Sequence, residues 1–464
     1  MNKFVLRLAP LAAAMALSGC SFIPTYERPA APVAAQWPGN APASGKAATD
    51  LAWQQFFSDA SLRQLIAIAI ANNRDLRMAV LNIEQARAQL GLKRADQLPT
   101  VNAALAGSRS PTGTGKYVSV DSAGLVITSY ELDFFGRVAS LKEQALSQYL
   151  ASQEGSRTAQ ISLVASVAQA WLGLVADREL LALSKRTLTT REDSLRLTQL
   201  RFDHGAASDL DLRQAQSLRE AARVTLAQQQ RQRALDENAL TLLLGQALPE
   251  DARAHLSEVS LAQLKLAELP AGAPSDLLTA RPDIRQAEAQ LIAANANIGA
   301  ARAAFFPRIS LTVGAGSASN ALSGLLQGGT WGFTQAPQLL MPLFDAGRNQ
   351  AGLDAAKSGR DIAVAQYEKA IQSAFREVAD ALAGRDTLTE QVQAQQAQAV
   401  AESARFGLTE LRLAHGAASQ LDWLDAQRSL FTVEQAVVTT QLAYLQNQVA
   451  LYKTLGGGVA SATP

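Results

Sequence analysis

The sequence has few of the residues from which most protein sites are built. Among its 464 residues it contains one cysteine and three histidines. A single cysteine excludes an intrachain disulfide framework and any metal site made of several cysteines. The 42 basic and 41 acidic side chains leave a net charge of +1 and form no basic block, which argues against a nucleic acid as a partner.

Motifs of enzymes and long apolar runs are also missing. Beyond the leader the sequence has no run of 18 or more apolar residues, so it predicts no transmembrane helix. It contains no HExxH motif and no Ser-His-Asp order. Gly113-Thr114-Gly115-Lys116 matches a phosphate-binding loop only in part, because Ser110 replaces its first glycine and Tyr117 its Ser or Thr. We therefore expect no catalysis, no cofactor and no metal.

The one cysteine follows a leader at the start of the chain. Lys3 and Arg7 make this start basic, and an apolar stretch ends in Leu17-Ser18-Gly19-Cys20. Small residues directly before a cysteine are typical of a bacterial lipoprotein signal, so we predict removal of residues 1–19 and acylation (palmitate) of Cys20. The alternative is an ordinary secretory signal with a coincidental cysteine. Ser21 rather than an aspartate comes next, which by resemblance to sorted lipoproteins points to the outer membrane.

An internal repeat determines the organisation of the rest. The stretch His204–Asp211 recurs as His415–Asp422, 211 positions later. Each copy lies between long proline-free segments with helical spacing of apolar residues. Glycine, two small residues and serine followed by Leu-Asp suit a tight turn and the N-cap of a new helix. The sequence therefore predicts two helical hairpins with tips near 204–209 and 415–420.

The helices before these tips are unusually long. Gly136-Arg137 opens a segment that reaches His204 without a proline, and Gly347-Arg348 matches it in the second repeat. If it were helical throughout, its roughly 67 residues would extend on the order of 100 Å. The segment is too polar to lie in lipid, so we expect it to project into water.

Strand-like runs precede each long helix. In the first repeat two strands are expected within 100–134, with residues 110–115 as the loop between them. Val118–Asp121 alternates apolar and polar residues, and Leu125–Leu132 is rich in β-branched and aromatic residues. In the second repeat, Ile309–Gly314 and Thr330–Phe344 are strand-like.

Four strands are too few to close a barrel, and an open sheet edge is not tolerated in lipid. Several chains must therefore share one barrel. Aromatic residues gather where strands meet helices, either as a membrane-interface girdle or as simple packing of the junction. They are Phe134, Phe135, Phe305, Phe306 and Phe344.

Several motifs together resemble one family. Besides the lipoprotein signal these are Pro24-Thr25-Tyr26-Glu27-Arg28-Pro29, the stretch Glu131–Arg137 (ELDFFGR) and the stretch Leu421–Leu430 (LDWLDAQRSL). The chain is similar, from its leader to about Gly458, to the OprM-like outer membrane factors of tripartite efflux systems, within the TolC-type family. This resemblance implies a homotrimer with a 12-stranded barrel, a long periplasmic helical tunnel and an equatorial domain. It implies as partners a periplasmic adaptor and an inner-membrane pump of the resistance-nodulation-division class.

The expected fold is mainly α with a transmembrane β-barrel, built from two tandem repeats with four strands per chain. A signal peptide (1–19) is followed by an extended N-terminal segment with equatorial contacts (20–58), the first repeat (59–245), an inter-repeat equatorial segment (246–274), the second repeat (275–456, with strands within 309–344) and a C-terminal tail (457–464). We expect the mature protein in the outer membrane, anchored through Cys20, with a long periplasmic extension.

A candidate gate lies just beyond the second tip. Leu421, Asp425 and Arg428 fall on one helix face at positions i, i+4 and i+7, and Asp422 is one step round from Leu421. The resemblance implies that these residues narrow the periplasmic mouth. Three symmetry-related aspartates facing one axis would repel unless arginine or a cation neutralised them. The alternative is a solvated Asp425–Arg428 pair worth a few tenths of a kcal/mol.

The tips themselves are candidate docking sites. They consist of Gly205, Ala206, Ala207 and Ser208 in the first repeat, and of Gly416, Ala417, Ala418 and Ser419 in the second. Such small residues let another backbone approach closely, and the resemblance implies that hairpin tips of the adaptor meet them. The alternative is a turn without a partner. His204 and His415 suit an interaction with the helix dipole better than a metal site.

The sequence thus predicts a passive exit duct for small molecules. A TolC-like exit for secreted proteins of type I systems is one alternative. A coiled-coil envelope lipoprotein without a pore is another, although the alternating residues at 116–132 argue against it.

Overall fold

The computed structural model describes residues 21–34, 36–37, 51–113, 115–270 and 276–458. The predicted lipidation site Cys20 lies outside these residues. The chain divides into two compact units. The first consists of residues up to 31, 81–154 and 285–370, and the second of 32–80, 155–284 and 371–464.

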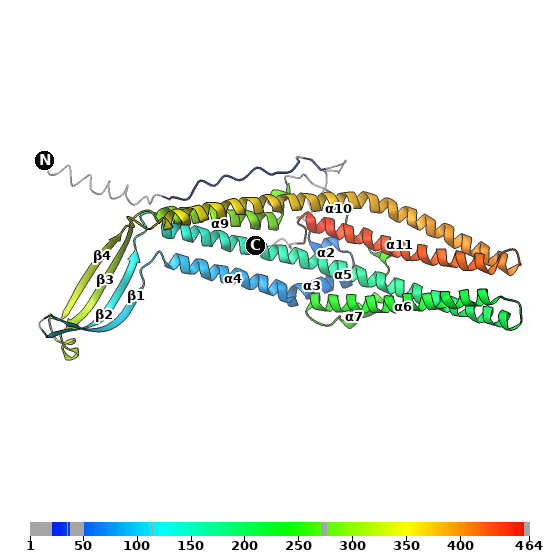
Figure 1. Ribbon diagram of the computed structural model, residues 1–464, viewed down its shortest axis with the longest axis horizontal. Coiled ribbons are helices and arrows are strands. Elements are labelled where there is room, and N and C mark those ends of the chain that lie inside the picture. Colours follow the sequence, from blue (N-terminus) through cyan, green and yellow to red (C-terminus); the bar gives the residue numbers. More distant parts are fainter. Residues whose placement is uncertain (1–20, 35, 38–50, 114, 271–275, 459–464) are drawn as a thin grey trace. The chain divides into compact units, whose positions relative to one another are not determined.

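The first unit contains an antiparallel sheet with the strand order β1-β2-β3-β4 (Figure 1). Its strands are β1 (Val101–Pro111), β2 (Tyr117–Glu131), β3 (Arg308–Ser319) and β4 (Trp331–Leu340). The pair β2–β3 joins the two sequence repeats, with Asp121 opposite Ser319. A short 3-10 helix, η4 (Leu322–Gly324), lies between β3 and β4. β1 and β4 are therefore the two edges of the sheet.

The predicted strands differ from the observed ones in one respect. Both runs singled out in the first repeat, 118–121 and 125–132, belong to the single strand β2, and the other strand is Val101–Pro111. β1 was missed as a run because it is made mainly of alanine, glycine, serine and polar residues, with little intrinsic preference for strands. Its pairing with β2, from Val101↔Ile127 to Pro111↔Tyr117, makes it a strand.

The remaining elements are helical, and both long helices contain 67 residues. The helices are α2 (Trp53–Phe56), α3 (Ala60–Asn72), α4 (Arg74–Ala95), α5 (Arg137–Asp203), α6 (Asp209–Leu244), α7 (Glu250–Leu256), the 3-10 helix η2 (Leu261–Gln263), α8 (Leu277–Ala280), α9 (Pro282–Ala303), α10 (Arg348–Ala414) and α11 (Gln420–Thr454). A mainly helical chain with a four-stranded sheet confirms the predicted fold class.

Helices α3 and α4 are separated by one extended residue, Asn73, inside a segment whose spacing is otherwise helical. Its Oδ1 accepts a hydrogen bond from the backbone N–H of Leu76 (2.9 Å), which caps α4. Its Nδ2 donates to the carbonyl of Leu243 (3.0 Å) near the end of α6. One buried side chain therefore ends one helix, starts the next and ties both to a third.

The core of the second unit forms around the middle of α5. Trp171, Leu174 and Val175 are fully buried there. Among the described residues, α5 is the one helix with a stretch long and apolar enough to cross a membrane, and 61% of that stretch is buried inside the fold. This burial identifies the stretch as a core segment.

The segment between the repeats packs against the start of the second unit. His255 Nε2 lies 2.8 Å from Asp59 Oδ2, and Phe57 forms an isolated antiparallel bridge with Leu266. Phe56 stacks on Tyr452 near the end of α11, with 4.0 Å between ring centroids. Residues of the N-terminal, inter-repeat and C-terminal parts therefore form one layer.

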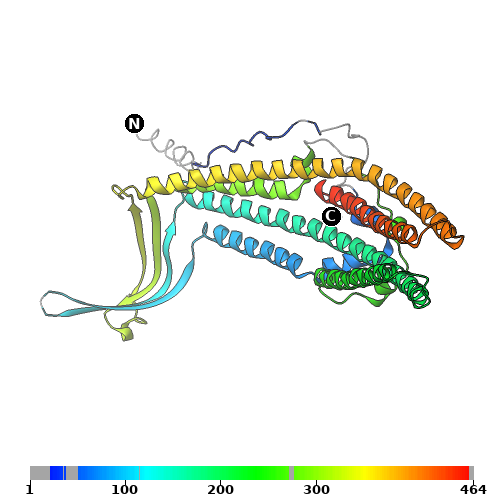
Figure 2. The ribbon, with the colours of Figure 1, turned by 45° about the vertical axis from the view of Figure 1, so that its right-hand side comes forward.

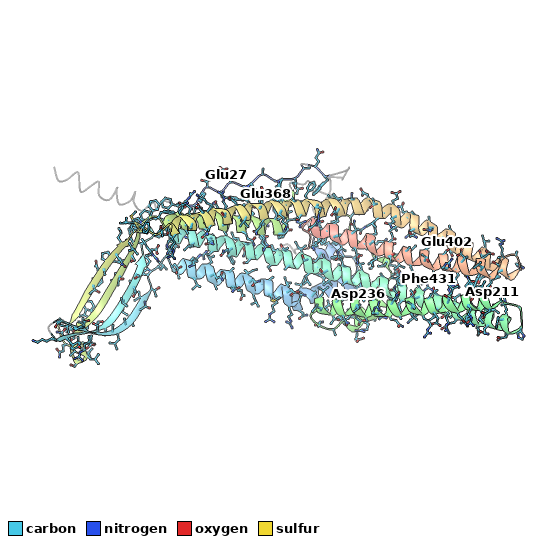
Figure 3. The ribbon with its side chains drawn as sticks, in the orientation of Figure 1. Glu27, Asp211, Asp236, Glu368, Glu402 and Phe431 are labelled. Atoms are coloured by element: carbon cyan, nitrogen blue, oxygen red, sulfur yellow. The ribbon has the colours of Figure 1, made fainter. Side chains whose placement is uncertain are left out.

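A buried aspartate of α5 faces an aspartate of α6. Asp177 is 5% exposed and faces Asp236, which Figure 3 labels on α6. Burial first, and then the hydrogen bond and charge of Asp236, raise the pKa of Asp177 to about 7, whereas Arg233 lowers it. Asp177 therefore gains or loses its proton near neutral pH.

This pair predicts a pH-dependent stability. Because the folded pKa of Asp177 is about 7 and its ordinary value is 3.8, its contribution to stability is greatest below about pH 4 and is lost as the pH rises through 7. Asp177→Asn should therefore flatten the fall of the thermal midpoint between about pH 5 and pH 8. Asp193→Asn, at an exposed position of α5, is the control. An unchanged pH profile of the Asp177 variant would contradict the assignment.

Candidate functional site

The two hairpin tips are the same turn built twice (Figure 2). Gly205 and Gly416 adopt left-handed φ angles of 73° and 74°, which end α5 and α10. The next residue closes each turn, because the N–H of Ala206 donates to Arg201 O (2.7 Å) and that of Ala417 to Arg412 O (2.8 Å). Such turns need glycine because side chains disfavour this backbone region.

The returning helices begin with identical capping boxes. Asp422 N donates to Ser419 Oγ (3.1 Å), and Ser419 N donates to Asp422 Oδ2 (2.9 Å). Ser208 and Asp211 form the same pair in the first repeat. The hydrogen bond from each serine lowers the pKa of its aspartate. Asp422 therefore has a structural role at the start of α11, which its grouping with the gate residues did not anticipate.

The two tip histidines lie at the C-terminal ends of the long helices. The N–H of His204 donates to Leu200 O, and that of His415 to Leu411 O, both at 3.2 Å. Within the described ranges, no group of three or more His, Cys, Asp and Glu side chains is placed to hold a metal ion. The geometry of the tips is accounted for by backbone and serine hydrogen bonds.

The first turns of α11 carry a charged cluster. Arg428 donates from Nη2 to Asp425 Oδ1, as the spacing i, i+3 predicts. Arg405 of α10 brings its Nη1 to 3.9 Å from Asp425 Oδ2. Arg405 also donates from Nε to Glu402 Oε2 (2.8 Å), and Figure 3 labels Glu402 on α10. Asp425 therefore lies between two arginines rather than one.

Arg405 was missed by sequence reasoning, although a signal for it exists. Arg405 and Asp425 are each ten positions from His415, one before and one after. In an antiparallel hairpin that turns at His415, such residues lie at the same level on facing helices. Counting the same number of residues before and after the tip thus identifies Arg405 as the partner of Asp425.

A buried arginine completes the cluster from the other hairpin. Arg191 of α5 is 4% exposed, and its Nη1 is buried with no hydrogen-bond partner in the described part of the chain. Burial first, and then the charge of Arg428, lower the pKa of Arg191 to about 10. Arg191 is therefore still charged at neutral pH and repels Arg428. No local motif marks this residue.

The gate candidate Leu421 and the buried side chains of α11 lie on different faces of this helix. Leu421 is 58% exposed, whereas Leu424 and Gln427 are buried. Phe406 of α10 packs near Trp423, with 6.1 Å between ring centroids. The buried face holds α11 in the unit, so the exposed apolar side chain of Leu421 is free to face another surface.

The edge strands of the sheet present large apolar side chains. β1 and β4 are exposed along their whole lengths. Leu105 is 72%, Trp331 73% and Phe333 58% exposed. Such surfaces need a lipid or protein environment.

The aromatic residues at the strand–helix junction divide into two groups. Phe135 stacks on Phe306, with 5.0 Å between ring centroids, which is packing of the junction. Phe344 is 91% exposed, as a residue at a membrane interface would be. Packing of the junction is therefore confirmed for Phe135 and Phe306, whereas a membrane-interface role of Phe344 stays a prediction.

Comparisons with known proteins identify relatives over the whole length. The family model "Outer membrane efflux protein" matches residues 65–246 and 273–457. The chain is 49% identical to the antibiotic efflux pump outer membrane protein ArpC of Pseudomonas putida, covering 99% of this chain and 96% of the relative. It is 46% identical to the solvent efflux pump outer membrane protein SrpC of the same species, covering 97% of each. The open state of the MtrE outer membrane channel of Neisseria gonorrhoeae superposes with a TM-score of 0.86 at 40% identity, covering 95% of this chain and 98% of that chain.

The capping boxes predict equal costs at the two tips. Ser208→Ala and Ser419→Ala should each destabilise the start of the returning helix by about 1 kcal/mol, because each removes the acceptor for a helix N–H. Hydrogen exchange of the first turns of α6 and α11 should then become faster. Ser403→Ala, at an exposed position within α10, is the control. Unchanged exchange at both tips would show that the boxes do not hold these helices.

Proposed function

The chain belongs to the outer membrane efflux protein family and is the outer membrane channel of a tripartite efflux pump, and we propose that residues of α10 and α11 close its periplasmic mouth. The channel is a homotrimer. Its partners are a periplasmic adaptor and an inner-membrane pump of the resistance-nodulation-division class. The protein is a channel and not an enzyme.

The sheet accounts for the trimer. Each chain offers four strands with the two edges β1 and β4, whose backbone groups need partners in a membrane. Three such sheets joined edge to edge give a closed barrel of twelve strands. The exposed apolar side chains of the edge strands then face lipid or the neighbouring copies.

The proposed cargo is small, amphiphilic or apolar molecules. ArpC is named for antibiotics and SrpC for solvents, which supports small molecules over secreted proteins as the cargo. The proposed membrane anchor is an acyl group on Cys20, which follows Leu17-Ser18-Gly19.

The proposed gate rests on Asp425, which is held between Arg405 and Arg428. In a trimer three copies of Asp425 would lie around one axis and repel one another if they were unpaired. Each carboxylate has its own arginines, so the closed mouth does not require a bound cation. Leu421, exposed on the same helix, would add an apolar constriction.

Opening would be helped by a repulsive contact. Arg191 is buried against α11 and repels Arg428. The carboxylate of Asp425, paired with Arg428 on the same helix, offsets part of the positive charge that faces Arg191. A closed mouth in which Arg191 still repels Arg428 is only weakly stable. Docking of the adaptor and pump could therefore open it at a low cost in free energy. Asp422 contributes by fixing the start of α11.

The gate is tested by single-channel conductance in planar bilayers. The double variant Asp425→Ala, Arg428→Ala should conduct severalfold more than the wild type, because the polar constriction is lost. The control is Asp193→Ala, Arg196→Ala, which removes an exposed aspartate–arginine pair of the same spacing on α5 (3.0 Å). Equal conductance of both double variants and the wild type would show that Asp425 and Arg428 do not close the mouth.

The proposed docking sites are the two tips. Residues 205–208 and 416–419 are small and mostly exposed, and their backbone N–H and C=O groups form compact turns. This leaves room for a second hairpin tip to approach closely.

Docking is tested without straining the glycines. Ala206→Tyr and Ala417→Tyr together should abolish most drug resistance conferred by the pump, because bulk at the tips blocks the adaptor. Conductance of the isolated channel should stay as in the wild type. Ala239→Tyr, at an exposed position of α6, is the matched control. Full resistance with both tips enlarged would contradict docking there.

A further inference from the structure

The motif Pro24–Pro29 has no part in the duct or its gate, yet it makes specific contacts. Arg28 donates to both carboxylate oxygens of Glu288, from Nε to Oε1 (2.7 Å) and from Nη2 to Oε2 (2.8 Å). The Tyr26 hydroxyl donates to Glu288 Oε1 (3.0 Å). The carboxylate of Glu288, only 12% exposed, thus binds two side chains of the motif.

The charges around Glu288 favour this arrangement. Bidentate arginine–carboxylate pairs are among the strongest polar contacts in proteins. Burial and the nearby charge of Glu288 raise the pKa of Tyr26, so its hydroxyl stays protonated and remains a donor. Tyr367 of α10, almost fully buried, lies beside the same groups.

Further contacts follow in order along α9. Asn295 Nδ2 donates to the carbonyl of Pro24 (2.7 Å), and Arg302 Nη1 donates to the carbonyl of Phe22 (3.1 Å). Phe22 stacks on Phe306, with 4.6 Å between ring centroids. From Arg28 through Pro24 to Phe22 the residue numbers decrease, while those of their partners on α9 increase from Glu288 through Asn295 to Arg302. The N-terminal segment and α9 therefore run antiparallel. We call residues Phe22–Arg28 the strap; it belongs to the dark-blue segment in Figure 1.

The lengths of the strap and its track agree. From Glu288 to Arg302, α9 rises about 21 Å at about 1.5 Å per residue. From Arg28 to Phe22, an extended chain spans about 20 Å at about 3.3 Å per residue. The strap is therefore fully extended, and little slack remains between its two ends.

A glycine of α9 makes room for the strap. A Cβ added to Gly299 would lie 2.7 Å from Ile23 Cγ1, 3.0 Å from Ile23 N and 2.6 Å from Ser140 Oγ. Any larger residue would displace the strap or Ser140. The track is thus fitted to the backbone of the strap as well as to its side chains.

We propose that the strap fixes the membrane anchor at the level where β3 leaves α9, with Glu288 as its lock. Phe22, two residues after Cys20, is stacked on Phe306, and β3 begins at Arg308. Two residues of extended chain reach only about 7 Å. Acyl chains on residue 20 would therefore enter the leaflet at the periplasmic end of the strands. This inference rests on the proposed acylation of Cys20.

Anchor and strap would then hold each other. Acyl chains in the membrane keep the strap near α9, and the docked strap keeps the acyl chains at the end of the strands. Two linked binding events of this kind reinforce each other through effective concentration. The strap would thereby couple membrane anchoring to the stability of the helices of the duct, which a flexible tether would not do.

The lock is tested by proteolysis of the acylated trimer in nanodiscs. Glu27 is exposed on the strap (Figure 3), and a glutamate-specific protease can cut after it once the strap is released. Glu288→Gln should speed this cut roughly tenfold or more, because a bidentate charged contact is lost. Glu368→Gln is the matched control, because no ion pair of Glu368 occurs among the described residues. The swapped pair Arg28→Glu, Glu288→Arg should restore much of the protection.

A second variant tests the track. Gly299→Ala should also speed the cut, whereas Gly91→Ala, which meets no atom within 4 Å, should not. Both changes favour the helix by up to about 1 kcal/mol, so faster cutting in Gly299→Ala cannot come from a weakened helix. Equal cutting of wild type, Glu288→Gln and Gly299→Ala would overturn the strap.

Coupling to the membrane needs a double-mutant cycle. The thermal midpoint of the trimer in nanodiscs is measured for Glu288→Gln, with Cys20 acylated and with Cys20→Ala behind a leader that is cleaved without acylation. We expect a larger loss in the acylated protein. An equal loss in both would show that the anchor does not act through the strap. Mass spectrometry of the N-terminal peptide tests acylation separately, and its absence would contradict the anchor while the proteolysis still decides whether Glu288 locks the strap.

Discussion

Unpaired strand edges are the constraint on which the rest of this protein depends. One chain supplies four strands, and the N–H and C=O groups along β1 and β4 need partners that a single chain does not provide. Lipid offers none, so the sheet closes only with copies of itself. The channel is a homotrimer, so three sheets close the barrel and every residue near its axis appears three times. At the proposed gate, Asp425 would thus become a ring of three negative charges that has to be neutralised.

The two repeats share a scaffold and differ in their chemistry. Both tips have the same left-handed glycine, the same closing backbone hydrogen bond and the same serine–aspartate capping box. Each hairpin also carries an aspartate–arginine pair at spacing i, i+3, but on different arms: on α5 before the first tip and on α11 after the second. Only Asp425 has a further arginine from the neighbouring helix, and only Arg428 faces a buried arginine of α5. Duplication therefore explains the shape of the hairpins, whereas the charged residues of the proposed gate are not repeated, because Gln214 and Ser217 stand where the second repeat has Asp425 and Arg428.

The N-terminal strap shows how a short motif can act at a distance from the duct. Its binding to α9 depends on the carboxylate of Glu288 and on Asn295 and Arg302, whose side chains donate hydrogen bonds to its backbone carbonyls. It also depends on Gly299, which leaves space for its backbone. None of these groups lies in the gate or at the tips. A segment without helix or strand is thus held along its length by side chains of α9.

Features that depend on neighbours in the sequence could be determined from the sequence alone. The turn residues of the tips, the proline-free helices and the repeat offset are local signals, so the two hairpins and the 67-residue helices follow from turn chemistry and periodicity. Family resemblance added the partners and the candidate gate. Contacts between distant residues were decided only by the tertiary structure. β1 became a strand by pairing, Asp422 became part of a cap, and Arg405, Arg191 and Glu288 gained their roles from partners on other elements. The physical reason is that pairing and burial of charge depend on which surfaces meet, and that is fixed only when the helices and strands pack.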